Sequence, residues 1–230
     1  MPIHEWTASP VFGVALTIMM YSIALAVRER LPWMHPLFLC CIGIILILTA
    51  FRIPYEHYAA GGQWISFLLG PATVALAVPL YKHWKLIRSD WLPIAAGIGT
   101  GTLISFFSTL GLIRSFGGSE ELLRSALPKS ASSPIAIEIV RVFGGIPELG
   151  AVLTVLTGLF GSMFGTMFLR WIGVRTDLAV GIAMGTSAHG IGTAKVIRDS
   201  ELRGAYSSLA MGVTGILVSI LSVFVYPLIK

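Results

Sequence analysis

The chain has 230 residues, of which 55% are hydrophobic and 12% are charged, and its mean hydropathy is +0.84. Because soluble domains carry about 25% charged residues, this composition excludes an ordinary soluble protein and indicates a polytopic membrane protein. The formal net charge of +5 does not indicate nucleic acid as a partner. The basic residues stand in short connections between apolar runs, and the chain has neither a basic tail nor an aromatic platform.

Seven apolar runs follow one another, most of them close to the roughly 20 residues that cross a bilayer as a helix. They cover residues 11–27, 36–51, 63–81, 91–113, 150–171, 178–196 and 204–229. The first run reads as an uncleaved N-out span, because Arg28 and Arg30 follow it and no basic residue precedes it. We therefore expect an all-α polytopic integral membrane protein with about six to eight transmembrane helices, some of them broken or re-entrant.

The sequence reads as one membrane domain over residues 1–230, with possible repeat halves at about 1–115 and 116–230. In the first half, residues 69–73 interrupt an apolar run, and a basic hexamer and a second apolar run follow. Residues 185–194 begin the same order in the second half. Interrupted spans at corresponding positions of two halves are typical of transporters. The alternative is a chance match of two short basic hexamers.

The basic residues leave one topological question open. If the connections that carry Arg28, Arg170 and Lys195 all lie inside, the run 178–196 must enter and leave the membrane on one side. The alternative lets this run cross, which places residues 195–203 outside. Charge alone does not decide between the two arrangements.

Residues 115–147 predict a re-entrant element. Ser119 followed by Glu120 indicates a helix start, since an acidic side chain is favoured at the positive end of the helix dipole. A polar break at 128–134 and a short apolar helix come next, and Gly144 and Pro147 end that helix. Such irregular backbone is tolerated at membrane depth only where protein or water surrounds it.

Three breaks, around Pro71, 130–134 and 187–192, are expected to open helices with free N–H groups, which bind anions. A small carboxylate is the expected ligand, with Lys129 as a cation and His189 as a second donor or a proton carrier. The candidate binding residues are Pro71, Thr73, Lys129, Ser130, Ser132, Ser133, Thr186, His189, Gly192 and Thr193.

Each of these residues has a purely structural alternative. Lys129 can extend to the membrane interface, and His189 can be a neutral group bonded between helices. Glu138 and Arg141 stand three residues apart on one helix and are interpreted as a neighbouring pair. The hydroxyls of the 185–194 stretch can serve only to let helices approach closely.

An intramembrane hydrolase is an alternative, because Ser130 or Ser187 with His189 supplies a nucleophile and a base. The chain lacks a nucleophile elbow, an HExxH motif and a clear acid to orient the imidazole. The adjacent Cys40 and Cys41 supply neither a disulfide framework nor a metal site. We therefore expect no enzyme, no catalytic residues, no metal and no cofactor.

Five segments give the chain a resemblance to the LrgB/CidB family. They are 69–81 (LGPATVALAVPLY), 127–136 (LPKSASSPIA), 144–147 (GGIP), 183–194 (AMGTSAHGIGTA) and 204–211 (GAYSSLAM). The resemblance covers nearly the whole chain in the order that the family shows. Relatives often have Thr-Ala-Ser-His where this chain has residues 186–189, and an acid where it has Arg203. His189 therefore keeps its place, whereas no role is carried over to Ser187 or to an acid at 203.

The resemblance implies a multi-pass protein of the bacterial inner membrane, with a small LrgA/CidA-type membrane protein as partner. It also implies antiholin-like control of murein hydrolases and autolysis, and similar proteins include carriers of pyruvate and of plastidial glycolate and glycerate. We therefore expect a transporter or channel for small monocarboxylates, as a homo-oligomer. The alternative is an antiholin-like regulator or pore component that modulates murein hydrolase export and lysis without specific transport.

Overall fold

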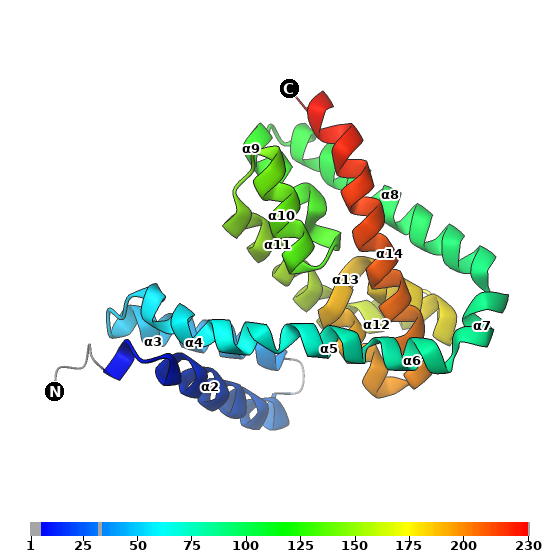
Figure 1. Ribbon diagram of the computed structural model, residues 1–230. Helices are drawn as coiled ribbons and strands as arrows, with labels where there is room; N and C mark the ends of the chain where they lie inside the picture. The colour runs from blue at the N-terminus through cyan, green and yellow to red at the C-terminus, as the bar shows by residue number, and fades with distance from the viewer. Residues whose placement is uncertain (1–5, 32–33, 230) are drawn as a thin grey trace. The chain divides into compact units, whose positions relative to one another are not determined.

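The computed structural model describes residues 6–31 and 34–229, apart from the side chains of Leu69 and Thr73. All regular elements in these ranges are helical, which confirms the expected all-α polytopic fold (Figure 1). The chain divides into two compact units, Met1–Ala75 and Leu76–Lys230. The single domain and the repeat halves expected from the sequence stay predictions.

The first unit is a small helical bundle. It consists of α2 (Pro10–Arg30), α3 (Pro36–Ala50), α4 (Tyr55–Phe67) and α5 (Leu69–Ala75). The Ser9 hydroxyl accepts from the Val11 N–H at the start of α2, where a proline fits because the first N–H groups lack helical partners. α2 packs against α3 and α4, and Gly13 and Gly61 let the backbones of α2 and α4 approach closely.

The predicted break around Pro71 corresponds to a short helix between two turns. Pro71 lies in α5, between single-residue turns at Leu68 and Leu76. The Ala72 N–H donates to the Leu68 carbonyl oxygen over 3.1 Å, which is the first helical hydrogen bond of α5. A helix therefore starts next to Pro71, at Leu69, and anion binding by its first N–H groups stays a prediction.

The second unit combines long helical runs with short elements between them. In chain order these are α6 (Ala77–Lys82), α7 (Trp84–Ser89), α8 (Trp91–Ser115), α9 (Glu120–Ala126), the 3-10 turn η1 (Leu127–Ser130), α10 (Ser133–Phe143), α11 (Pro147–Phe160), the π-helical turn η2 (Gly161–Gly165), α12 (Thr166–Trp171), α13 (Asp177–Asp199), α14 (Glu201–Val225) and the 3-10 turn η3 (Tyr226–Leu228). α14 runs through this unit, with α10 and α11 on one side and α8 on the other (Figure 1).

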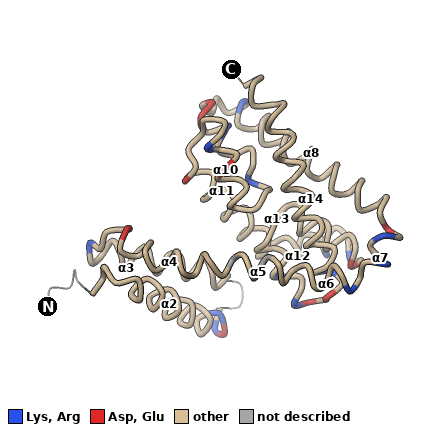
Figure 2. The backbone as a smooth tube through the Cα atoms, viewed as in Figure 1, with Lys and Arg blue, Asp and Glu red and all other residues tan. Residues whose placement is uncertain are grey.

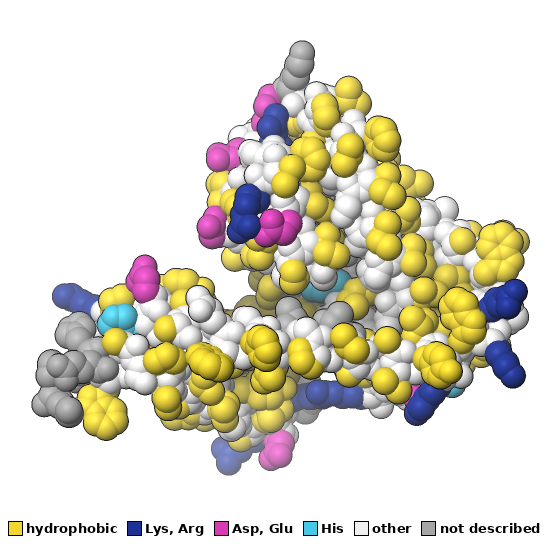
Figure 3. All heavy atoms as spheres, viewed as in Figure 1, with side chains coloured by type: hydrophobic (Ala, Val, Ile, Leu, Met, Phe, Trp, Pro, Cys, Tyr) yellow, Lys and Arg dark blue, Asp and Glu magenta, His cyan; other side chains and the backbone are white. Residues whose placement is uncertain are grey.

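Five helical runs of the described chain are long and apolar enough to cross a membrane. They are Pro10–Arg30, Tyr55–Lys82, Trp91–Ser115, Pro147–Trp171 and Glu201–Leu228. The apolar helix α3 has 15 residues and is a sixth, shorter candidate. Large apolar side chains such as Ile104 and Phe224 are exposed on these runs, and hydrophobic side chains cover much of the visible face in Figure 3. This surface suits lipid, and the chain is a multi-pass membrane protein.

Contacts between distant residues define two ends of the second unit. At one end, Lys82 Nζ lies 2.8 Å from Glu201 Oε1, and the Tyr206 hydroxyl donates to Asp90 over 2.7 Å. We call this the basic end because it gathers Lys82, Lys85, Arg88, Arg170, Arg175, Lys195, Arg198 and Arg203. At the C-terminal end, the Arg124 guanidinium donates to the carbonyl oxygen of Ile229 over 3.2 Å. Figure 2 shows most charged residues of this unit at its ends, with few between them.

The segment α13 is a re-entrant hairpin, which resolves the question that charge left open. His189 breaks α13 into two helical arms, residues 177–188 and 190–199. The Ser200 hydroxyl donates to Asp177 Oδ2 over 3.2 Å, and Arg203 Nε donates to Asp177 Oδ1 over 2.6 Å. Because the end of the second arm returns to the start of the first, the segment enters and leaves at the basic end.

The segment from α9 to α10 enters the second unit from the C-terminal end. Ser119 caps α9 by accepting from the Leu122 N–H, and Gly144 ends α10 in the left-handed conformation at φ 80°, which confirms both predicted boundaries. The Ser125 hydroxyl accepts from the Ile146 N–H over 2.8 Å, so the chain returns to α9 after α10. The predicted re-entrant element is present, with η1 at its tip.

Cysteine labelling tests the path of α13. We expect single cysteines at Ile172 and Arg198, both exposed at the basic end, to react with a membrane-impermeant maleimide from the same side of sealed vesicles. The background carries Cys40→Ser and Cys41→Ser, and Glu121→Cys near the C-terminal end serves as the control that labels from the opposite side. Labelling of positions 172 and 198 from opposite sides would show that α13 crosses the membrane.

Candidate functional site

His189 forms the tip of the α13 hairpin and is 3% exposed. Its backbone has φ 39° and ψ −136°, a conformation that glycine adopts easily and that strains other residues by about 1–3 kcal/mol. The imidazole Nε2 lies 2.8 Å from the Thr154 carbonyl oxygen in α11. Because a carbonyl oxygen only accepts, Nε2 carries the hydrogen of this bond, which leaves Nδ1 as the second polar atom of the ring.

Glycines of α11 and η2 make room for this tip. A Cβ at Gly158 would lie 2.6 Å from His189 Cε1 and 2.7 Å from Nε2, closer than real Cβ contacts. The π-helical turn η2 starts at Gly161, whose missing side chain leaves space for the Ala188 methyl group. π-helical turns inside α-helices are frequent at functional sites. The position of the imidazole therefore depends on small residues in the facing helix.

Hydroxyls next to the tip satisfy its backbone. The Thr193 hydroxyl donates to the His189 carbonyl oxygen over 2.8 Å and lies 2.8 Å from Ser207 Oγ of α14. Gly192 is buried, and a Cβ there would lie 2.9 Å from the Met184 carbonyl oxygen in the other arm. These contacts hold the two arms together where helical hydrogen bonds are interrupted.

Thr186 of the first arm has a buried hydroxyl for which the described residues offer no hydrogen-bond partner. Its methyl group would lie 3.1 Å from a Cβ at Gly101 of α8, so the side chain points toward α8. A buried hydroxyl without a partner costs about 1–3 kcal/mol, and a water or a ligand oxygen removes that cost.

The second tip, η1, presents the only cation among the candidate residues. Lys129 is half-buried, and its Nζ lies 3.5 Å from Ser105 Oγ of α8. Ser105 Oγ in turn lies 2.6 Å from Ser130 Oγ, which is buried. Lys129 forms no ion pair with any residue that the structure describes. Two hydroxyls and one uncompensated ammonium group therefore meet at this tip.

The helix α10 starts directly beside this cluster. Ser132 is its N-cap residue, and its side chain makes no capping hydrogen bond to the N–H groups of the first turn. Ser133 and Pro134 form that first turn, where proline fits because it lacks an N–H. The expected helix N-terminus is therefore present at 130–134, with N–H groups that favour an anion.

Both tips lie between the ends of the long helices of the second unit. Thr154 lies about 10 Å along the helical run from Pro147 and about 25 Å from Trp171. Ser105 lies about 21 Å from the start of α8 and about 15 Å from its end. η1 packs against α8, α11, α13 and α14. The structure thus brings the second and third predicted breaks into one region.

The other residues that the sequence analysis considered have the following positions. Pro71 is exposed and belongs to the first unit, as does Thr73, whose side chain lies outside the described residues. Ser187 is exposed and donates to its own helix at the Ala183 carbonyl oxygen over 2.6 Å. The hydrogen bonds of Ser130, Ser187 and His189 lead to other partners, so no serine is hydrogen-bonded to the imidazole.

Glu138 and Arg141 lie 2.6 Å apart on the surface of α10, which confirms that they pair as neighbours. Among the described residues, no group of three or more His, Cys, Asp or Glu side chains could hold a metal ion.

Three partners of the tips were missed by the sequence analysis: Ser105, Thr154 and Ser207. Hydroxyl residues inside the apolar runs of α8, α11 and α14 were the available signal, since polar groups at membrane depth tend to face the interior of the bundle. Thr154 acts through its backbone carbonyl, however, and any residue type could supply that group.

The chain is similar to one family of proteins over most of its length. The LrgB-like family model matches residues 17–228. The protein YxaC of Bacillus subtilis is 38% identical over 208 residues, which cover 90% of each chain. A protein of Haemophilus influenzae is 37% identical over 218 residues, covering 93% of this chain and 94% of that one. The holin-like protein CidB of Staphylococcus aureus is 32% identical over 210 residues, covering 90% and 92%. No solved structure matches the chain.

Gly158→Ala tests whether the space opposite His189 is required. The added methyl group would displace the imidazole and break its bond to Thr154, so we expect a loss of about 1–3 kcal/mol in stability. The matched control is Gly212→Ala in α14, where a Cβ meets nothing within 4 Å and the helix should gain slightly. Thermal unfolding of the purified protein measures both changes. Equal midpoints for the two variants would contradict the packing described.

Proposed function

The chain belongs to the LrgB-like family, and on that premise we propose that it carries small monocarboxylates of the pyruvate or glycolate type across the bacterial inner membrane. Substrate binds between the tips of the two re-entrant segments, η1 and the His189 bend of α13. No step of covalent catalysis, cofactor or metal enters this proposal. The observation that carries it is the uncompensated ammonium group of Lys129 between the ends of the long helices.

A half-buried cation without a carboxylate partner favours an anionic ligand. Charged groups at membrane depth are costly and usually mark a substrate path. Lys129 Nζ reaches only the Ser105 hydroxyl, at 3.5 Å, among the described residues. A substrate carboxylate supplies the missing charge and accepts hydrogen bonds from Nζ, from Ser130 and from the first N–H groups of α10. The small size of the hydroxyl side chains around it suits a two- or three-carbon acid.

His189 provides the second polar wall of this binding site. Its Nε2 is engaged with the Thr154 carbonyl oxygen, so Nδ1 is the atom that faces substrate. In the neutral ring Nδ1 accepts a hydrogen bond, and in the protonated ring it donates one to a carboxylate. Protonation of His189 therefore accompanies anion binding, which couples carboxylate movement to a proton. Thr186 and Thr193 complete this wall.

The family also connects the chain with lysis. The Staphylococcus aureus relative is named a holin-like protein, and the family resemblance implies control of murein hydrolases together with a small LrgA/CidA-type partner. Carboxylate transport and the control of lysis are compatible functions. Autolysis can respond to the flux of carboxylate and to the proton that accompanies it. A regulator or pore without specific transport is the competing function, and solute selectivity separates the two.

Lys129→Met should lower the uptake efficiency for labelled pyruvate or glycolate into proteoliposomes about 10- to 100-fold, because it removes a charge-assisted hydrogen bond. Lys85→Met is the matched control, since Lys85 is an exposed lysine of α7 at the basic end. Wild-type uptake should saturate with concentration, and vesicles should retain an unrelated neutral solute. Absence of carboxylate uptake by folded protein, or leakage of the unrelated solute, would favour the pore.

His189→Gly separates the role of the imidazole from that of the backbone. Glycine relieves the backbone strain at φ 39°, which offsets the loss of the imidazole bond to Thr154, so we expect a thermal midpoint close to that of the wild type and loss of transport. Ser187→Ala is the control from the same stretch, because the Ser187 hydroxyl is exposed and bonds only to its own helix. Unchanged uptake by folded His189→Gly would remove the imidazole from the binding site.

A further inference from the structure

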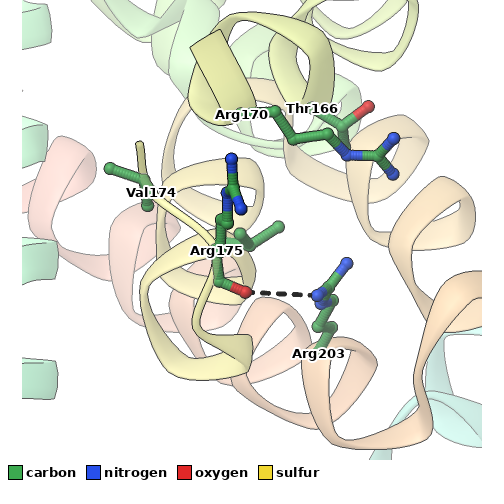
Figure 4. A pocket seen from close by; sticks show the side chains of 6 residues that line it. Thr166, Arg170, Val174, Arg175 and Arg203 are labelled. Carbon is green, nitrogen blue, oxygen red and sulfur yellow. Dashed lines mark hydrogen bonds between the residues drawn. The ribbon is translucent and has the colours of Figure 1, made fainter. Parts of the chain in front are cut away.

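A pocket of about 320 Å³ lies at the basic end, and none of the tip residues lines it. Arg170 of α12, Arg175 of the α12–α13 connection and Arg203 of α14 line it together with Thr166, Val174 and Val180. Figure 4 shows the three arginine side chains around the same hollow. Three guanidinium groups from separate segments therefore converge on a space of the size that small ligand groups occupy.

The charge in this pocket is only partly balanced. Arg203 Nε donates to Asp177 over 2.6 Å, and Arg203 Nη2 donates to the Arg175 carbonyl oxygen over 3.3 Å. Arg170 and Arg175 form no ion pair with any described residue. One acid therefore faces three cations. Since guanidinium groups match the oxygens of phosphate in pairs, a phosphate group is the ligand that this arrangement favours.

The surface next to the pocket is apolar. Trp171 is 81% exposed, and Phe168 and Met167 on the preceding turn of α12 are also exposed. The rings of Phe168 and Trp171 lie 6.0 Å apart. Exposed tryptophan beside basic residues is typical of the boundary between hydrocarbon and headgroups, and an excess of basic residues marks the cytoplasmic side.

We propose that this pocket binds the phosphate group of an anionic phospholipid, with the acyl chains lying along the exposed apolar face of α12. A free phosphate ion shares the headgroup chemistry but makes no use of the apolar surface, so the lipid is the occupant that fits both observations. Basic pockets between transmembrane helices are suited to anionic headgroups. The site is separate from the proposed carboxylate site, because it uses none of the tip residues.

Titration of the purified, delipidated protein in mixed micelles tests the proposal. Phosphatidylglycerol should raise the thermal midpoint in a saturable way, whereas phosphatidylcholine and inorganic phosphate should not. Arg170→Gln and Arg175→Gln should each weaken the apparent affinity for phosphatidylglycerol about fivefold, and the double variant about 25-fold. Arg88→Gln, an exposed arginine of α7 that does not line the pocket, is the matched control.

The outcomes are distinct. Protection by inorganic phosphate equal to that by phosphatidylglycerol would overturn the lipid and leave a site for a free anion. Equal protection by phosphatidylcholine would show that the pocket does not select an anionic headgroup. The arginines would also be excluded as ligands if the double variant and Arg88→Gln bound phosphatidylglycerol with equal affinity. If the double variant does not fold, the single variants with their unliganded midpoints still give the fold-change per arginine.

Discussion

The second unit depends on one constraint: a backbone that leaves the helical path at membrane depth must find its hydrogen bonds inside the protein. The chain does so twice, at η1 and at His189. At His189, the Thr193 hydroxyl bonds to the tip carbonyl, and the imidazole bonds to α11. At η1, the Ala131 N–H donates to the Pro128 carbonyl oxygen, and Ser105 of the neighbouring helix α8 bonds to the Ser130 hydroxyl. Both tips can exist because long helices surround them, and the same enclosure creates a place shielded from lipid where polar groups gather.

Close packing makes this enclosure possible. Gly181 and Gly185 bring the first arm of α13 against the backbone of α14 near Ser207, and Gly158 leaves room for the imidazole. Small residues of this kind let helices approach in membranes, where lipid provides little hydrophobic drive for association. The glycines that looked like a polar interruption in the sequence are thus contact surfaces. Because these glycines lack side chains, neighbouring residues of the candidate site occupy the space beside them.

Much of the fold and of the candidate site could be predicted from the sequence. Apolar runs predicted the helices, the Ser119 and Gly144 signals predicted the bounds of α9 and α10, and the hydroxyls around Lys129 and His189 predicted two of the three breaks. The path of α13 was not readable, because it depends on bonds of Asp177 to residues 23 and 26 positions away. Local patterns do not encode such pairings. The remaining predicted break, around Pro71, corresponds to the turn at Leu68 that separates α4 from α5.

Asp177 has a wider consequence for how the hairpin moves. Its carboxylate joins the first residue of one arm to Ser200, just beyond the other arm, so chain and hydrogen bonds together form a closed loop around His189. One arm cannot slide past the other without opening this loop, and movement of the hairpin as a single body is the motion that preserves it. Arg203 is bonded to the same carboxylate and lines the basic pocket. An occupant of that pocket and a ligand at the tip would therefore both act on this hairpin, and thermodynamic linkage would make any influence between them reciprocal.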